Sequence, residues 1–241
     1  MTFSQLEIPF PLFEADTNDA SGYVGVRRCS LCGAENHCFD LGIGCAVMVQ
    51  CPNCDSENGL DADDREETPC RQCDMPIPFP SFLQHDDEIV ACHKCLRSGK
   101  AAITQDTSYG MISWEQAYAG LTHGVPSRNQ CDFELVEDED GWLQAKLPQE
   151  ILFDLLRTPT YSSLQGERWQ FCCRCPMIFI GRWSRDRFTA ESASGQGEVL
   201  FNEIVQDVVP GLWEDRLHDL TGIYVFRCPE CGRRTAHWDI A

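Results

Sequence analysis

Six pairs of cysteines, each separated by two residues, carry the recognisable chemistry of this chain. They read CSLC, CPNC, CRQC, CHKC, CCRC and CPEC, and they supply Cys29, Cys32, Cys51, Cys54, Cys70, Cys73, Cys92, Cys95, Cys172, Cys175, Cys228 and Cys231. Sixteen cysteines scattered at random over 241 residues would give about one such pair. Two intervening residues let both sulfurs of a tight turn, here called a knuckle, face one cation, and tetrahedral zinc sites combine two knuckles. The spacing therefore predicts Zn²⁺ in two or three structural four-cysteine sites.

The spacing between knuckles suggests how they combine. Eighteen residues separate the CSLC and CPNC pairs, and the same spacing recurs between CRQC and CHKC, displaced by 41 positions. This is an internal repeat of the zinc-ribbon type, which favours pairing neighbouring knuckles, although a crossed or nested arrangement would use the same sulfurs. A third site would join the CCRC and CPEC pairs, where Cys173 leaves the choice of ligands open.

Residues next to the knuckles refine this prediction. Gly33 and Gly232 directly follow the second cysteine of their pairs, where a knuckle commonly turns through positive φ. The pairs followed by Asp55, Asp74 and Leu96 lack that signal. Four cysteines remain outside the pairs, and as small hydrophobic residues they are expected in the core; they are Cys38, Cys45, Cys131 and Cys173. Three histidines near knuckles are alternative ligands, namely His37, His93 and His237.

Other cysteine chemistry fits the sequence less well. Disulfides need an oxidising compartment, and the N-terminus lacks the basic and apolar regions of a signal peptide. Thioredoxin-like redox chemistry needs a βαβ setting, whereas these pairs lie among Gly, Pro and Asp. Iron–sulfur ligation stays open for four-cysteine sets, but the compact ferredoxin pattern is absent. A closed structural site is therefore expected, without an enzymatic role.

Charge restricts the partners. The chain has 19 basic and 38 acidic residues, a formal net charge of −19, and such a field repels phosphate backbones and attracts cationic partners. No apolar stretch reaches the 18 or so residues needed to span a bilayer, so a cytoplasmic protein without membrane or direct nucleic-acid contact is expected. Two acidic runs are candidate partner-binding loops: Asp61, Asp63, Asp64, Glu66 and Glu67, and Glu137, Asp138, Glu139 and Asp140.

The sequence pattern changes near residue 100. Residues 1–100 consist mainly of knuckles and turns, predicting small zinc-ribbon modules that depend on metal for folding. Residues 101–241 predict a mixed α+β domain with a zinc-stapled antiparallel sheet. Ser113 caps a helix over SWEQAYAGL, and LPQEILFDLLRTP forms a second helix stopped by Pro159. Between them, CDFELVEDEDGWLQAKL predicts a hairpin with an acidic tip.

The last eighty residues predict further strands and helices. Four short apolar or alternating runs suit strands, namely RWQFCC, MIFIGRW, IYVFRC and TAHWDI. Residues 198–220 read as one or two helices broken near Pro210 and Gly211. The expected fold class is therefore α+β.

Three stretches together resemble the CbrC family of bacterial proteins: LEIPFPLFEAD followed by CSLCG, CHKCLRSGKAA, and RTPTYSSLQGERW at 157–169. The last is the most specific, through Arg157, Thr158, Pro159, Tyr161, Gln165, Glu167 and Trp169. This chain departs from short family members by extra cysteine pairs in its first hundred residues. The resemblance implies tolerance of colicin-type toxins and a candidate immunity protein, and it implies no catalytic residue.

The expected function is therefore a non-enzymatic immunity or tolerance protein that binds and neutralises a bacterial toxin, a nuclease effector being favoured. The cognate toxin would present a basic surface to the acidic runs. One alternative is that these runs are merely solvated turns. Two other function classes stay open: a zinc-ribbon adapter in transcription or stress response, and a metal-dependent enzyme, which would need a His or carboxylate completing an incomplete metal site. The RTPTYSSLQGERW segment either presents Tyr161 and Trp169 to a partner or forms a helix stop, a turn and a core strand. The structural alternative is favoured, because proline and aromatic residues are ordinary at such a junction.

Overall fold

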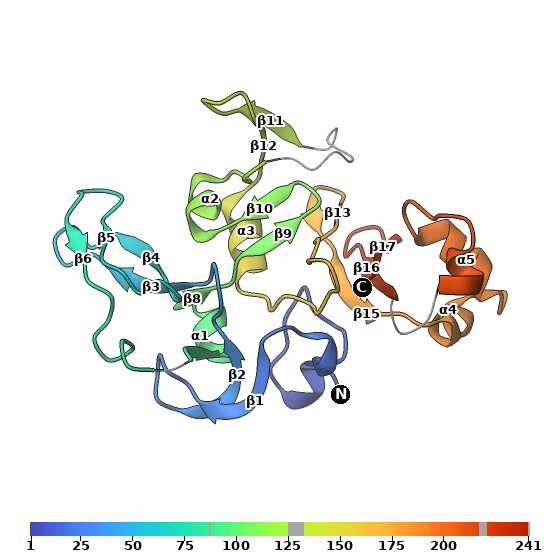
Figure 1. The fold of residues 1–241 in the computed structure, drawn as a ribbon, viewed down its shortest axis with the longest axis horizontal. Coiled ribbons are helices and arrows are strands. Elements are labelled where there is room, and N and C mark those ends of the chain that lie inside the picture. The colour runs from blue at the N-terminus through green and yellow to red at the C-terminus, as the bar shows by residue number, and fades with distance from the viewer. Residues whose placement is uncertain (87, 125–132, 217–220, 241) are drawn as a thin grey trace. The chain divides into compact units, whose positions relative to one another are not determined.

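The computed structural model describes residues 1–86, 88–124, 133–216 and 221–240, as small antiparallel sheets with short helices (Figure 1). Its contacts define two compact units. One is Ser21–Thr160, and the other joins Met1–Ala20 to Tyr161–Ala241. The mixed content of helices and antiparallel sheets agrees with the expected α+β class. No helix in the described ranges is long and apolar enough to cross a bilayer.

The Ser21–Thr160 unit contains two three-stranded sheets and three short hairpins. One sheet has the order β1 (Tyr23–Arg28), β2 (Glu35–Asp40), β7 (Val90–Cys92), and the other β4 (Glu57–Asp61), β3 (Ala46–Gln50), β8 (Ala101–Ala102). The hairpins are β5 (Thr68–Pro69) with β6 (Pro76–Ile77), β9 (Gln105–Thr107) with β10 (Gly110–Ile112), and β11 (Glu134–Glu137) with β12 (Leu143–Lys146). The helix α1 (His93–Arg97) directly follows β7.

Two long-range strand pairings close this unit. β7 returns antiparallel to β2, with Cys92 opposite Cys38, and β8 returns to β3, with Ala102 opposite Ala46. In sequence, the strands β3 to β6 therefore lie between β2 and β7, which pair with each other. The 41-residue repeat in sequence is consequently not a pair of successive structural modules.

Two helices of this unit form where the sequence predicts them. α2 (Trp114–Ala119) begins at the Ser113 cap in a capping box with Gln116, and Gly120 ends it in the left-handed conformation. α3 (Gln149–Leu156) buries Leu152, Leu155 and Leu156, three apolar positions on one helical face. It ends before Pro159, whose preceding residue is disfavoured in helical conformation. The buried leucine face ties α3 to the core of the unit.

The other unit is built on the sheet β15 (Ile178–Arg182), β16 (Thr221–Arg227), β17 (Arg234–Ile240). The short hairpin β13 (Phe171–Cys172) and β14 (Cys175–Pro176) precedes it in sequence. Two α-helices and a π-helical turn pack their aromatic side chains with the strands: α4 (Arg185–Glu191), α5 (Gly197–Ile204) and η4 (Leu212–Arg216). The sequence patterns predict α5 and the break after it, whereas α4 is an additional helix, capped by Ser184 accepting from the amide of Arg187.

The first twenty residues belong to this second unit, which corrects the expected domain boundary at residue 100. They contain the 3-10 turns η1 (Ser4–Leu6) and η2 (Thr17–Asp19). Phe13 stacks edge-on against Phe179 with ring centroids 5.1 Å apart, and the Glu14 amide donates to the carbonyl of Phe179. Phe3 packs on Phe13 and is fully buried. The N-terminal segment therefore packs with this unit, although it directly precedes the knuckles of the other unit in sequence. Buried aromatic side chains stabilise this packing because they bury a large apolar surface per residue.

Tyr161 and Trp169 of the RTPTYSSLQGERW segment are buried in this unit, which favours the structural interpretation of the segment, whereas most residues between them are exposed. Tyr161 is fully buried; its hydroxyl lies 2.7 Å from Nε2 of His237 and accepts from the amide of Arg168. Trp169 is also fully buried and donates from Nε1 to the carbonyl of Met177. These two contacts therefore join the segment to β17 and to the residue that precedes β15.

Candidate metal centres

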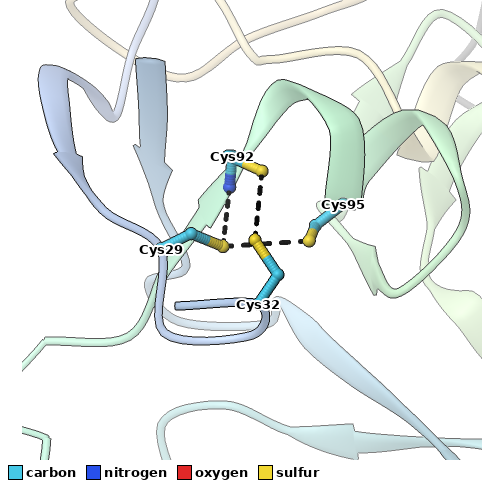
Figure 2. A group of neighbouring side chains, drawn as sticks. All are labelled: Cys29, Cys32, Cys92 and Cys95. Carbon is cyan, nitrogen blue, oxygen red and sulfur yellow. Dashed lines mark hydrogen bonds between the residues drawn. The ribbon is translucent and has the colours of Figure 1, made fainter. Parts of the chain in front are cut away.

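The described residues contain three groups of cysteine thiols whose sulfurs all lie within 4.8 Å of one another. Group one, shown in Figure 2, is Cys29, Cys32, Cys92 and Cys95. Sγ of Cys29 lies 3.8 Å from Sγ of Cys95, and Sγ of Cys32 lies 3.8 Å from Sγ of Cys92. Three of its four cysteines are buried, and Cys32 is exposed. The first four knuckles thus pair in the nested arrangement, the first with the fourth and the second with the third, rather than the first with the second and the third with the fourth.

Group one joins a turn between two strands to the start of a helix. Cys29 and Cys32 form the turn between β1 and β2, whereas Cys92 caps the start of α1 and Cys95 lies within that helix. The return of β7 to β2 brings the second pair back, and the amide of Cys92 donates to Sγ of Cys29 at 3.3 Å. Sheet pairing therefore assembles this group.

Group two is Cys51, Cys54, Cys70 and Cys73. Its knuckles lie between β3 and β4 and between β5 and β6. Sγ of Cys51 is 3.7 Å from Sγ of Cys73, and Sγ of Cys54 is 3.6 Å from Sγ of Cys70. Ser56 contributes a hydroxyl 3.1 Å from Sγ of Cys70. Group two is consequently a self-contained module inserted between the halves of group one.

Group three is Cys172, Cys173, Cys228 and Cys231. Sγ of Cys172 lies 3.7 Å from Sγ of Cys231 and 3.8 Å from Sγ of Cys173. Cys173, expected as core filler, is exposed and belongs to the group, whereas Cys175, expected as a ligand, lies outside it. The tight turn of the β13–β14 hairpin explains the exchange, because it places Cys173 at its apex and Cys175 on the returning strand.

Four knuckles share one backbone pattern. In each, the amide of the first cysteine donates to the carbonyl five residues on, and the amide of the residue after the second cysteine donates back to the first. That residue has positive φ in every case: Gly33 at 72°, Asp55 at 58°, Asp74 at 56° and Gly232 at 71°. Aspartates thus occupy the conformation that the sequence signals only at the glycines. Asp and Asn tolerate left-handed backbone better than most residues with side chains.

The sulfur spacing fits a tetrahedral thiolate site. A metal–sulfur bond of about 2.3 Å implies neighbouring sulfurs about 3.8 Å apart in a tetrahedron, whereas a disulfide holds them at about 2.0 Å. The six sulfur pairs given above measure between 3.6 and 3.8 Å. All three donor sets can therefore hold a metal ion such as Zn²⁺, and four thiolates would fill its coordination sphere.

Local hydrogen bonds lower the pKa of several thiols toward the ionised state that a metal needs. The hydroxyl of Ser56 lowers the pKa of Cys70 to about 5. The backbone amide of Ala34 lowers the pKa of Cys32 to about 7, and that of Arg233 lowers the pKa of Cys231 to about 7. Burial acts in the opposite direction and raises the pKa of Cys51 to about 11. Each group therefore contains at least one sulfur prepared for ionisation.

Within the described ranges, the remaining cysteines and histidines do not join these groups. Cys38 and Cys45 are buried as core residues, which confirms the prediction for both, and Cys131 lies outside the described residues. His37 lies with Nδ1 2.6 Å from the Tyr23 hydroxyl, and His237 contacts Tyr161. His93 is the first residue of α1 and is outside group one.

The acidic residues predicted to contact a partner lie in the Ser21–Thr160 unit, which holds 23 acidic and 10 basic residues, a net charge of −13. Two of them shape their own turns. Asp61 Oδ1 accepts from the amide of Asp63, and Asp138 Oδ1 accepts from the amide of Trp142. The other seven are exposed: Asp63, Asp64, Glu66, Glu67, Glu137, Glu139 and Asp140. Trp142, beside the second run, is 69% exposed.

Comparison with known proteins places the chain in a family. The model of an uncharacterised protein family, UPF0167, matches residues 56–240. The chain belongs to UPF0167. It is similar to UPF0167 protein PA1536 of Pseudomonas aeruginosa, with 25% identity over 191 residues that cover 69% of this chain and 98% of the relative. No solved structure gives a significant match. The UPF0167 match includes all of group three but only the second knuckle of groups one and two.

Proposed function

We propose that this protein is a non-enzymatic immunity protein that binds and neutralises a bacterial toxin, with zinc ions in the three cysteine groups setting its shape. A nuclease effector is the toxin class we favour, since such a protein presents cationic residues to phosphate. The resemblance to the CbrC family supplies the toxin context. The observation that carries the binding role is the concentration of charge in one unit.

The charge distribution supports a basic protein partner. The Ser21–Thr160 unit carries a net charge of −13, while the other unit, with 15 acidic and 9 basic residues, carries −6. Within the Ser21–Thr160 unit, two runs of exposed acidic residues lie in the loop after β4 and at the tip of the β11–β12 hairpin. Complementary fields accelerate encounter between proteins, and a few aromatic anchors set the lifetime of the complex. Trp142 is suited to be such an anchor.

The donor sets support a structural rather than a catalytic metal. Structural zinc sites are closed by four protein ligands, whereas catalytic zinc keeps a position open for water or substrate. Each group here offers four sulfurs. Zinc is the ion we propose because it prefers tetrahedral thiolates and needs no redox partner. Metal analysis of the purified protein should give three zinc ions per chain, one for each group.

The binding proposal is tested by purifying the protein together with the product of the adjacent gene and by challenging cells with that product. We expect a stable complex, protection of the cells, and an association rate that falls as salt concentration rises. Neutralising the hairpin with Glu139→Gln and Asp140→Asn should slow association. The matched control, Glu198→Gln and Glu203→Gln on α5, should leave it unchanged. No complex and no protection would overturn the proposal.

A further inference from the structure

A fifth, half-buried thiol lies beside group three, whereas the thiol opposite Cys92 of group one, that of Cys38, is fully buried. Cys175 is outside the group, and its Sγ donates a hydrogen bond to the carbonyl of Cys172 at 3.0 Å. Cys172 itself is a member of the group. Cys172 thus supplies a sulfur to the group and a backbone carbonyl to the spare thiol.

The turn that creates this arrangement is unlike the other knuckles. Cys173 and Arg174 both have positive φ, 53° and 61°, as in the two-residue type I′ turns of β-hairpins. Cys172 and Cys175 are therefore direct partners across the β13–β14 ladder. Antiparallel partners have Cα atoms about 4.5 to 5.5 Å apart, which lies inside the range that a disulfide spans. The hairpin can accept a Cys172–Cys175 bond without rearranging its backbone pairing.

Exposure also sets this group apart. Cys173 and Cys231 are exposed, and Cys172 and Cys175 are half-buried. Group one has three buried cysteines, and group two has two buried and two half-buried ones. A small polar oxidant therefore reaches group three more readily than the others.

We propose that group three is a metal site released by oxidation, in which a peroxide joins Cys172 to Cys175. This inference rests on the proposed metal binding and is independent of the toxin partner. Cys175 attacks one peroxide oxygen, the O–O bond breaks, and a sulfenic acid forms with loss of one water. Cys172 then leaves the metal and attacks the sulfenic sulfur; the S–O bond breaks, and the departing hydroxide takes up a proton to become a second water.

The electrons balance, because each sulfur loses one electron and the peroxide gains two. Three sulfurs then remain for the metal: Cys173, Cys228 and Cys231. A tetrahedral zinc ion that loses one of four thiolates is held less tightly and exchanges with solvent or a chelator. Reduction of the disulfide restores the fourth ligand, so the site can be reloaded.

The test uses the full zinc-loaded chain with hydrogen peroxide, a chromogenic zinc chelator and mass spectrometry. Wild-type protein should release one of three zinc ions, lose two hydrogen masses, and yield a Cys172–Cys175 disulfide peptide. Cys175→Ser, whose hydroxyl can still donate to the Cys172 carbonyl, should bind three zinc ions and retain them at the same peroxide dose. Cys38→Ser, which removes a thiol outside the groups, should respond as the wild type does.

Several outcomes would contradict the inference or the metal binding on which it rests. If Cys175→Ser binds only two zinc ions, Cys175 is a required ligand and the inference is wrong. If the variant releases zinc as fast as the wild type, or if the mapped disulfide joins other cysteines, it is wrong too. A wild-type chain that contains fewer than three zinc ions before oxidation contradicts the metal premise instead. Near-ultraviolet circular dichroism before treatment establishes that the variants are folded.

Discussion

Sγ of Cys29 lies 3.8 Å from Sγ of Cys95, although 66 residues separate the two in sequence. Between them, the thiols of Cys51 and Cys73 meet across a separation of only 22 residues. Group one thus closes a long loop that contains the whole of group two. This nesting gives the two groups different weights in stability, since the entropy removed from the unfolded chain grows with loop length.

Loss of group one should destabilise the Ser21–Thr160 unit more than loss of group two. The two loop lengths differ by a factor of three, and each doubling adds about 0.6 kcal/mol to the closure term. Cys92→Ser should therefore lower the free energy of unfolding by about 1 kcal/mol more than Cys70→Ser does. Urea titrations of the two variants in excess zinc measure this difference. An equal or reversed order would show that loop closure does not control the stability of this unit.

Removal of metal should affect the two units unequally. The β15–β16–β17 sheet has an aromatic core with Phe179 and Phe226 fully buried, which does not depend on sulfur ligands. The β1–β2–β7 and β5–β6 pairings, in contrast, adjoin groups one and two. Hydrogen exchange after chelation should show lost protection in these pairings and retained protection in β16. Equal loss in both places would argue against metal-dependent folding of one unit.

The hydroxyl of Tyr161 should add to the free energy of unfolding beyond what burial of the ring contributes. Its hydroxyl contacts His237 Nε2 and accepts from the Arg168 amide in a fully buried position. Tyr161→Phe removes the hydroxyl from both contacts, and the expected loss in free energy of unfolding is about 1–3 kcal/mol. Tyr118→Phe, at a tyrosine that is 42% exposed, is the matched control, and its effect should stay within about 0.5 kcal/mol. Similar effects of both substitutions would remove the role assigned to this hydrogen-bonded contact.

Stability should fall at alkaline pH. Burial raises the pKa of Cys45 to about 11 from its ordinary value of 9.0, and burial also raises the pKa of Tyr224 above its ordinary value of 10.0. Because the folded-state pKa lies above the unfolded one, each group contributes stability that is complete below its ordinary pKa. The contribution of Cys45 is lost as pH rises from about 9 toward 11, and that of Tyr224 is lost as pH rises above about 10. Urea titrations at about pH 8, 9, 10 and 11 should show the decline. Cys45→Ala should make it shallower from about pH 9 and Tyr224→Phe from about pH 10. An unchanged slope in both variants would refute this origin.

Local signals were sufficient for several elements. Ser113 with Gln116 marks the start of α2, the leucines of α3 mark its buried face, and the turn after Glu137 marks the β11–β12 hairpin. Each of these features depends on residues close together in the sequence. The six knuckles are likewise local motifs, and their existence is apparent from spacing alone.

The pairing of knuckles is not a local property. Every knuckle offers the same two sulfurs, so the partner is chosen by the return of β7 to β2, and the strands involved are too short to signal that pairing. The exchange of Cys175 for Cys173 depends on positive φ at Cys173 and Arg174. Neither residue is a glycine, so the sequence gives no signal of this conformation. Docking of Phe13 against Phe179 is likewise a long-range choice. The sequence pattern near residue 100 therefore predicts a boundary that the tertiary contacts do not follow.

Counting zinc in double variants tests the nested pairing most directly. Cys29→Ser with Cys51→Ser removes ligands from two groups, and Cys51→Ser with Cys70→Ser removes two ligands from one group. Native mass spectrometry should therefore show two zinc ions lost from the first variant and one from the second, while Cys131→Ser keeps the wild-type content. The opposite result, one ion lost from the first variant and two from the second, would mean that the first knuckle pairs with the second and the third with the fourth, and would contradict the nested arrangement.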